Sequence, residues 1–296
     1  MSTQGVMQGV TMAYLKTIGI VNNGDNGRGF ANPHDVVVSR DGRIFVLNRC
    51  DPARATAIRV GICNLDEEYL GEFGNGFGEG DGQFGLPVAM ALDSQERLYV
   101  TDEYLHRISV FDTSGTFLGK WGAMGSGNGE VNGPAGIAID ADDHVYIADQ
   151  NNHRIQKFTG DGTFVTSFGN SGDGDGQFSR PSGVTVDADG NIYVADWGNE
   201  RVQVLGPDGS FQQRLRGQAT LSKWASDFFA VNPDEKETRE MSDLTPSLPP
   251  HLETPYQISS QVEPYFWGPV SVKVDADNRL YVAETNRHRL QIYQKV

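Results

Sequence analysis

The stretch EVNGPAGIAIDADDHVYIADQNNHRIQKFTGDGTFVTSFG, residues 130–169, decides the fold because the chain repeats its pattern. Equivalent residues in three consecutive copies, Phe84, Val131 and Phe178, are spaced 47 apart. A regular period of this length indicates an array of similar supersecondary units rather than one irregular fold. The other copies are residues 82–122 and 176–217, together with less exact ones that begin at Phe30 and Phe266.

Each copy predicts four short strands joined by tight turns. The first strand, such as GVTVD at 183–187, alternates apolar and small residues and ends at a turn rich in Asp and Gly. These residues reverse the chain because they bond the local backbone and tolerate positive φ. The second strand, such as NIYVAD at 191–196, is rich in β-branched and aromatic residues, as strands prefer. Four strands in about this length are typical of one blade of a β-propeller.

The fifth copy has only three strands before the last residue, Val296. The missing strand is predicted at the other end, where Tyr14–Gly19 reads like the fourth strand at Phe117–Gly122. The N-terminal strand is therefore expected to complete the last blade and close the ring, which protects the sheet edges. The chain is predicted to be a single all-β domain, 1–296, with blades at about 30–74, 82–122, 129–169, 176–217, and 266–296 plus 13–20.

The repeats resemble the NHL family in their spacing, turn residues and predicted ring closure, over about residues 13–217 and 266–296. The resemblance implies an NHL-type β-propeller, and such propellers are usually six-bladed. Five four-stranded blades are recognisable in this chain, so a ring of five or six blades is expected.

Residues 218–265 interrupt the repeats. Leu221, Trp224 and Phe228 recur at helical spacing, which predicts one or two helices over 221–241. The proline-rich stretch 244–264 is predicted to be extended or irregular. Either a sixth blade has been lost or replaced here, or a five-bladed ring carries an insert, and we favour the insert. It is expected on the face that carries the loops between second and third strands, as a plug between blades or as a lid over a pocket.

The composition argues against some partners. The formal net charge of −15 repels nucleic acid and anionic membranes, so neither is an expected partner. The N-terminus lacks the basic and apolar segments of a signal peptide, and no stretch approaches the roughly 20 apolar residues of a membrane helix. The two cysteines, Cys50 and Cys63, do not resemble a disulfide pair, so a cytoplasmic location is expected.

Two polar columns recur in the aligned repeats. An arginine opens the third strand of every copy, and an acid, or asparagine in the first copy, ends the second strand. An acid and an arginine across a hairpin form a charge-assisted hydrogen bond, and a feature repeated in every blade favours a scaffold role. The columns are Arg59, Arg107, Arg154, Arg201 and Arg289, and Asn48, Asp102, Asp149, Asp196 and Glu284.

The first repeat departs from the others and supplies the candidate site. Its loop from Asn48 to Arg59 runs 11 residues, against five in the other copies, and adds Arg49 and Arg54. Its first strand begins with His34-Asp35, at positions expected to ring the mouth of the central channel. We predict His34, Asp35 and Arg49 as catalytic residues, with Asn48 and Arg54 binding an anionic substrate. The alternative is a longer solvated loop and a turn histidine with its hydrogen bonds satisfied.

The Pro33-His34 step also resembles peptidyl-α-hydroxyglycine α-amidating lyases, which are propellers with metal-binding histidines at this step in several blades. The resemblance implies one divalent metal, zinc or calcium, with His34 as a ligand. The full histidine set is missing, because the corresponding residues cannot ligate zinc through an imidazole. They are Val88, Ala135, Ser182 and Val270.

Two functions remain open from the sequence. The first is an enzyme, a lyase or hydrolase that binds a small molecule or modified peptide at the channel mouth. The second is a non-catalytic NHL interaction module, in which Tyr104 and Trp197 on the loops engage a protein or peptide. The two differ in whether convergent polar groups line a concave pocket or aromatic groups form an exposed patch. The sequence does not determine the oligomeric state.

Overall fold

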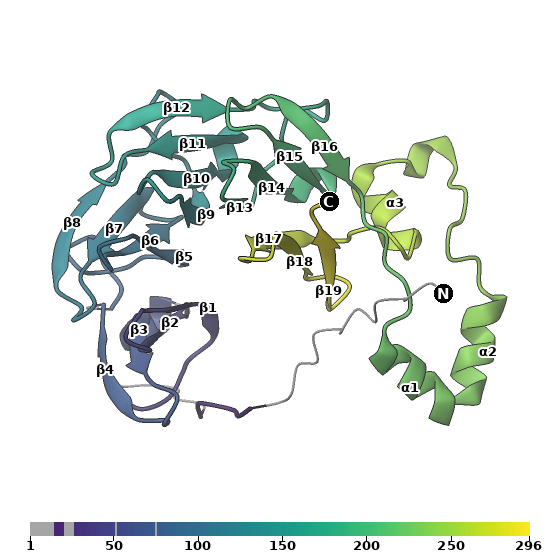
Figure 1. Ribbon diagram of the computed structural model, residues 1–296, viewed down its shortest axis with the longest axis horizontal. Coiled ribbons are helices and arrows are strands. Elements are labelled where there is room, and N and C mark those ends of the chain that lie inside the picture. The colour runs from purple at the N-terminus through teal and green to yellow at the C-terminus, as the bar shows by residue number, and fades with distance from the viewer. Residues whose placement is uncertain (1–14, 21–26, 51, 75) are drawn as a thin grey trace, which may run out of the picture.

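The computed structural model describes residues 15–20, 27–50, 52–74 and 76–296. These residues form five antiparallel sheets that follow one another around a common axis, as Figure 1 shows. Within each sheet the strands are ordered as in the chain, with the first strand nearest the axis. The all-β propeller of five blades is thereby confirmed, and five is the number of blades.

The blades match the predicted repeats. Blade 1 is β1 (Pro33–Val38), β2 (Ile44–Asn48), β3 (Arg59–Cys63) and β4 (Tyr69–Phe73). Blade 2 is β5 (Pro87–Leu92), β6 (Leu98–Asp102), β7 (Arg107–Phe111) and β8 (Phe117–Trp121). Blade 3 is β9 (Pro134–Ile139), β10 (Val145–Asp149), β11 (Arg154–Phe158) and β12 (Phe164–Phe168). Blade 4 is β13 (Gly183–Val186), β14 (Ile192–Asp196), β15 (Arg201–Leu205) and β16 (Phe211–Leu215), and blade 5 is β17 (Pro269–Val274), β18 (Arg279–Glu284) and β19 (Arg289–Gln294).

The turn between first and second strands works as the Asp and Gly pattern predicts. In blade 4 the carboxylate of Asp187 accepts hydrogen bonds from the backbone N–H groups of Asp189 and Asn191, at 3.0 and 2.9 Å. Gly190 adopts a φ of 81°, which a side chain would disfavour. The turn therefore closes on its own side chain, and this sets where the second strand begins.

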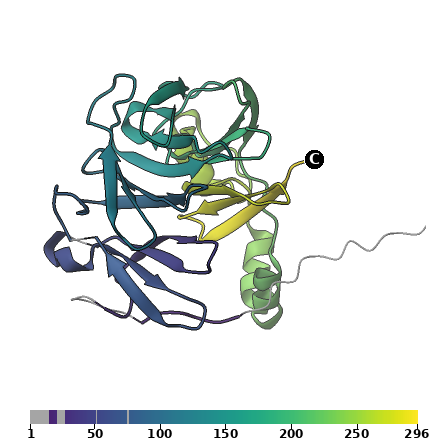
Figure 2. The ribbon, with the colours of Figure 1, turned by 60° about the vertical axis from the view of Figure 1, so that its left-hand side comes forward.

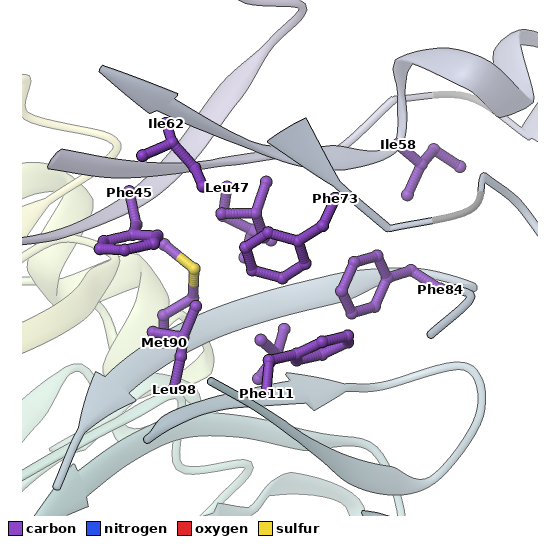
Figure 3. Close-up of a cluster of buried hydrophobic side chains, with 11 residues drawn as sticks. Phe45, Leu47, Ile58, Ile62, Phe73, Phe84, Met90, Leu98 and Phe111 are labelled. Carbon is purple, nitrogen blue, oxygen red and sulfur yellow. The ribbon is translucent and has the colours of Figure 1, made fainter. Parts of the chain in front are cut away.

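The hydrophobic core lies between neighbouring blades. Figure 3 shows the cluster between blades 1 and 2, where Phe45 and Leu47 face Phe84, Met90 and Phe111. Similar clusters join blades 2 and 3, 3 and 4, and 4 and 5. Burial of aromatic and aliphatic side chains at every such junction stabilises the array, at about 25 cal/mol for each Å² of apolar surface.

The predicted ring closure is wrong. Blade 5 is a three-stranded sheet, and residues 15–20 form no strand beside β19. They lie against blade 1 instead: Lys16 donates to the carbonyl of Leu65, and the N–H of Phe30 donates to the carbonyl of Ile20 at 2.9 Å. These contacts hold the segment away from β19. Tyr14, the first residue of the predicted strand, lies outside the described residues.

The insert contains the predicted helices. They are α1 (Lys223–Val231) and α2 (Pro233–Met241), which stand beside the propeller in Figures 1 and 2. The proline-rich stretch is less irregular than predicted, since it forms a 3-10 turn, η4 (Pro250–Leu252), and α3 (Pro255–Gln261). Pro255 suits the first turn of α3 because its fixed φ and missing N–H are tolerated there.

The insert lies on the predicted face. α3 packs against η3 (Trp197–Asn199), the 3-10 turn in the loop between the second and third strands of blade 4. Arg287, in the same loop of blade 5, donates a hydrogen bond to the carbonyl of Ser259 at 2.8 Å. Two further 3-10 turns occupy these loops in other blades, η1 (Pro52–Ala57) and η2 (Gln150–Asn152). None of the helices in the described part of the chain is both long enough and apolar enough to cross a bilayer.

Candidate functional site at the central channel

The acid and arginine columns have the predicted scaffold role in blades 3, 4 and 5. Arg201 donates to Asp196 at 2.7 Å, Arg154 to Asp149 at 2.8 Å, and Arg289 to Glu284 at 2.8 Å. Arg154 and Arg201 also donate to backbone carbonyls of the glycine-rich turn that leads into their blade, and Arg289 donates to the carbonyls of Glu263 and Tyr265 at the end of the insert. For Arg201 these carbonyls belong to Asp173, Gly174 and Gln177.

Blades 1 and 2 use the same positions differently. In blade 2, Asp102 accepts the N–H groups of Gly85 and Leu86 at 2.6 and 3.0 Å, and Arg107 donates to the carbonyl of Glu79. In blade 1, the acid is replaced by Asn48, and Arg59 forms its ion pair with Glu72 at 2.8 Å. The departure of the first repeat therefore changes the charge pairing of its blade.

A cavity of about 380 Å³ lies where the first strands of all five blades meet. Its wall contains the residues at the His34 position of every repeat, which confirms that this column rings the channel. Most of the wall is small or apolar, so few groups are available for chemistry. The residues of this column are His34, Val88, Ala135, Ser182 and Val270.

One sector of the cavity carries charged groups from blades 1 and 2. His34 begins β1, Arg49 follows β2, and Glu103 follows β6; all three line the cavity, and Arg49 forms an ion pair with Glu103. The side chain of His34 is exposed at the wall of this cavity and loses part of its hydration there. This partial burial, together with the positive charge of Arg49, holds the pKa of His34 below its ordinary 6.5, although Asp35 and Glu103 oppose the shift. A neutral imidazole can act as a general base near neutral pH.

Asp35 lines the same cavity with its carboxylate already engaged. It accepts the N–H of Val36 at 2.9 Å and the N–H of Met90 at 2.7 Å. The second bond crosses from blade 1 to blade 2, so Asp35 helps to fix the two strands that carry His34 and the apolar wall. Its catalytic role remains a prediction.

Asn48 and Arg54 do not join this group. Asn48 is fully buried: its Oδ1 accepts the N–H of Ala31 at 2.8 Å, and its Nδ2 donates to the carbonyls of Val46 and Arg59. Its predicted contact with a substrate is therefore corrected, because its polar atoms serve the backbone. Arg54 is exposed on η1 and lines a neighbouring hollow that also contains Cys50, so it lies apart from the central cavity.

The two loop aromatics lie outside the cavity wall. Tyr104 is exposed beside Phe77, with ring centroids 6.0 Å apart. Trp197 is partly exposed at the start of η3, and the guanidinium of Arg180 lies over its ring at 5.2 Å. The structure thus separates the two predicted sets, with the charged groups in the channel and the aromatic groups on the loops.

Sequence reasoning missed Glu103, Gln150 and Thr285, which also line the cavity. Each directly follows the acid that ends its second strand, as Arg49 follows Asn48. The residue after this acid differs in every repeat, whereas the acid itself is almost constant. That contrast was the signal in the sequence that could have identified these cavity residues. Lys273 of β17 adds a cation from blade 5 to the wall.

The zinc site implied by the amidating-lyase resemblance does not fit this cavity. Among the described residues, His34 is the single imidazole of the cavity wall. Asp35 is bonded to two backbone N–H groups, and Glu103 is paired with Arg49. Elsewhere among the described residues, Asp140, Asp142 and His144 lie together on a strand-connecting turn. Asp140 there accepts the backbone N–H groups of the other two, which is the turn geometry seen in blade 4.

Cys50 and Cys63 are both free thiols, as expected. Cys63 is buried in β3, and this burial raises the pKa of its thiol. A raised thiol pKa lowers the thiolate fraction, so Cys63 is a packing residue rather than a nucleophile.

Comparison with known proteins agrees with the repeats. The family model described as NHL repeat matches residues 131–158, 178–205 and 266–293. No curated protein sequence matches the chain. Among solved structures, streptogramin B lyase is similar with a TM-score of 0.55 at 14% identity, over 95% of this chain and 72% of that one.

Two further structures share the architecture. Virginiamycin B lyase from Staphylococcus aureus, solved as a catalytically inactive variant with quinupristin, has a TM-score of 0.54 at 14% identity, over 94% of this chain and 73% of its own. The nidogen/laminin complex has a TM-score of 0.55 at 16% identity, over 88% and 75%. Identities this low establish the fold alone. The repeats of blades 3, 4 and 5 thus match the NHL repeat, and the five blades have the architecture of an NHL-type β-propeller.

Proposed function

We propose that this protein binds a small molecule with an anionic group in its central channel and acts on it as a lyase, with His34 as the general base. The observation that carries the proposal is the convergence of His34 and the Arg49–Glu103 pair on one cavity whose remaining wall is mostly small or apolar. Convergent polar groups in a concave apolar pocket are typical of ligand sites.

The charges around His34 suit proton abstraction from carbon. The neutral imidazole takes a proton from the carbon next to a carbonyl group, the bond from the neighbouring carbon to the leaving group breaks, and a carbon–carbon double bond forms. The proton then passes from His34 to the leaving group, so the histidine is regenerated. Arg49 binds the anionic group and offsets the negative charge that develops on the carbonyl oxygen.

Glu103 has a positioning role in this scheme. Its ion pair holds the guanidinium of Arg49 at the channel wall, and it belongs to blade 2 whereas Arg49 belongs to blade 1. The bond from Asp35 to the N–H of Met90 joins the same two blades. The geometry of the site is thus set by the junction between blades 1 and 2, which is also one of the packed core junctions.

Structural likeness to known lyases supports the proposed reaction class. Two of the similar propellers are lyases, and one of them was solved as an inactive histidine-to-alanine variant bound to quinupristin. A propeller lyase that is inactive without one histidine supports the assignment of His34 as the general base.

The test is incubation of the purified protein with quinupristin and with a panel of carboxylate-bearing esters, followed by mass spectrometry of the products. A lyase yields an unsaturated product without added water, whereas a hydrolase adds one water and would transfer the proposal to hydrolysis. His34→Ala is expected to lower kcat by about 10²–10⁴-fold. His251→Ala, an exposed histidine of the insert, is the matched control and should leave kcat unchanged. Equal loss in both variants, or full activity in His34→Ala, would contradict the role of His34.

A second candidate function rests on the exposed pair of Tyr104 and Phe77. Aromatic side chains on a loop face are typical anchors for a protein partner. The similar propeller in the nidogen/laminin complex was solved with a protein partner. Capture of a peptide by the wild type but not by Tyr104→Ala, with no turnover of any small molecule, would favour this function over the lyase.

A further inference from the structure

A glutamine belongs to the buried polar cluster of blades 3, 4 and 5. It lies two residues after the column arginine, so the two side chains are on the same face of the third strand. In blade 4, Nε2 of Gln203 and Nε of Arg201 both donate to Oδ2 of Asp196, at 3.3 and 2.7 Å. Nε2 of Gln203 also donates to the carbonyl of Gln177. One carboxylate oxygen therefore accepts from both side chains.

Blades 3 and 5 repeat this arrangement. The shared oxygen accepts Nε of the arginine at 2.8 Å in both blades, and it accepts Nε2 of the glutamine at 3.0 Å in blade 3 and 2.8 Å in blade 5. The residues are Asp149, Arg154 and Gln156 in blade 3, and Glu284, Arg289 and Gln291 in blade 5. The three clusters define a place beside the arginine where an oxygen atom lies.

Blade 2 keeps the arginine in position but has a serine instead of the glutamine. The terminal nitrogens of Arg107 donate to three backbone carbonyls, at the positions equivalent to those that Arg201 uses. These carbonyls belong to Glu79, Gly80 and Gln83. Ser109, at the glutamine position, is fully buried, and its side chain is shorter than that of glutamine. The guanidinium is therefore placed as in blade 4, while the group beside it is smaller.

The acid of blade 2 is bonded elsewhere. The carboxylate of Asp102 accepts backbone N–H groups, which belong to Gly85, Leu86, Tyr104 and Leu105. Nε of Arg107 and Oγ of Ser109 are both buried, and neither has a hydrogen-bond partner within the part of the chain that the structure describes. A buried polar group without a partner costs free energy, so such groups are normally bonded to protein atoms or to an ordered water molecule.

We propose that blade 2 binds a buried water molecule at the place of the shared carboxylate oxygen. The water accepts a hydrogen bond from Nε of Arg107 and bonds Oγ of Ser109. It donates to the carbonyl of Gln83, which is equivalent to the carbonyl that accepts from Gln203 in blade 4. About three polar partners are usual for a buried water, and serine in place of glutamine leaves space for one.

The groups around the site favour water over an anion. A halide would accept hydrogen bonds from Arg107 and Ser109, but it has no proton to donate to the carbonyl of Gln83. The carboxylate of Asp102, which is 1% exposed, would also repel an anion in this buried place. Water both accepts and donates, so it fits all of these groups.

The water also explains how blade 2 can use its acid for the loop at the channel. Two of the N–H groups that Asp102 accepts belong to Tyr104 and Leu105, which directly follow Glu103. Glu103 lines the central cavity and pairs with Arg49. With the water bonded to the arginine, the carboxylate holds the turn that carries Glu103 without leaving the arginine unsatisfied.

The direct test is a high-resolution crystal structure of the protein, grown with bromide as the sole halide. We expect a peak of electron density within hydrogen-bond distance of Nε of Arg107 and Oγ of Ser109, with no anomalous signal at the bromine absorption edge. An anomalous peak would assign a halide to the site and overturn the proposal. So would a structure with no peak there, or one in which Asp102 turns to bond Arg107.

A stability measurement tests the same site in solution, because the sign of the effect depends on the water. Ser109→Ala removes a hydroxyl that bonds the water, so we expect the melting temperature to fall by about 2 °C. Removal of an unpartnered buried hydroxyl would instead leave the melting temperature unchanged or raise it, and either result would contradict the proposal. Ser167→Ala, at an exposed position of β12, is the matched control and should leave the melting temperature almost unchanged.

Discussion

Blades 1 and 4 derive from the same repeat and use its two polar columns differently. In blade 4, Asp196 is fully buried and accepts hydrogen bonds from Arg201, Asn199 and the N–H of Ser179. In blade 1, Asn48 at the same position bonds only the backbone, and the arginine of the column pairs with Glu72.

The difference separates polar side chains that stabilise the fold from those that are available to bind a ligand. In blade 4 the polar side chains of these columns form hydrogen bonds with turns and neighbouring strands. Blade 1 lengthens its loop and places His34 and Arg49 at the channel, where Glu103 of blade 2 pairs with the arginine. A repeat that departs from the common pattern is thus the one that gives the channel its charged sector.

The largest expected effect comes from breaking the buried pair of blade 4. Arg201→Ala leaves Asp196 buried without its partner and frees three carbonyls of the preceding turn, which should reduce the free energy of unfolding by about 3–5 kcal/mol. Urea denaturation measures this. Arg214→Ala, which removes an exposed ion pair with Asp175, is the control and should cost less than about 1 kcal/mol. Equal losses would show that burial of the pair is unimportant.

A smaller effect is expected when blade 1 is given the acid of blade 4. Asn48→Asp replaces an amide that donates to the carbonyls of Val46 and Arg59 with a carboxylate that cannot donate. We expect a loss of about 1–3 kcal/mol in the free energy of unfolding. Adding Glu72→Gln should recover part of it, because Arg59 can then pair with the new acid. A single variant as stable as the wild type would mean that the blades are interchangeable here.

Glu200 of blade 4 occupies the position of His106 and His153 in blades 2 and 3, and its N–H partner is Gly268 of blade 5, at 2.5 Å. Burial raises the pKa of this carboxyl from 4.5 to about 7, and the charge of Glu284 adds to the rise. Because the folded-state pKa is the higher one, the contribution of Glu200 to stability is largest below about pH 4.5 and falls as pH rises to about 7.

Glu200→Gln keeps an oxygen for Gly268 and removes the charge. It should therefore stabilise the protein at about pH 8, by about 1–3 kcal/mol, and have little effect at about pH 4. Urea denaturation across this range measures the difference. A stabilisation that does not depend on pH would rule out titration of Glu200 as its cause.

The smallest effect concerns the electrostatics of the channel. Arg49→Gln removes a positive charge that helps to lower the pKa of His34, so this pKa should rise. Nuclear magnetic resonance titration of the imidazole protons measures the shift. Arg54→Gln, a residue outside the cavity, is the control. An equal shift in both variants would contradict the placement of Arg49 beside His34.

Much of the site follows from comparing the repeats. His34 stands out because its column is small or apolar in the other repeats, and Arg49 stands out because it lies in the lengthened loop of the first repeat. The structure places both at the channel. Asn48 and Arg54 share the same loop, yet one is turned into the backbone and the other faces a different hollow. The two residues diverge because Asn48 ends β2, whereas Arg54 lies six residues later on the 3-10 turn η1.

The sequence by itself determined the blades, their strands, the turn chemistry and the two helices of the insert. Each depends on local periodicity and on short-range bonds such as that of Asp187 to its own turn. The tertiary structure decided how the ring ends, how Arg59 is paired, and which residues meet at the channel. Those outcomes depend on contacts between distant segments, such as Lys16 with Leu65 and Arg49 with Glu103. Other residues of similar local chemistry could have made the same contacts, so a sequence pattern does not choose between them.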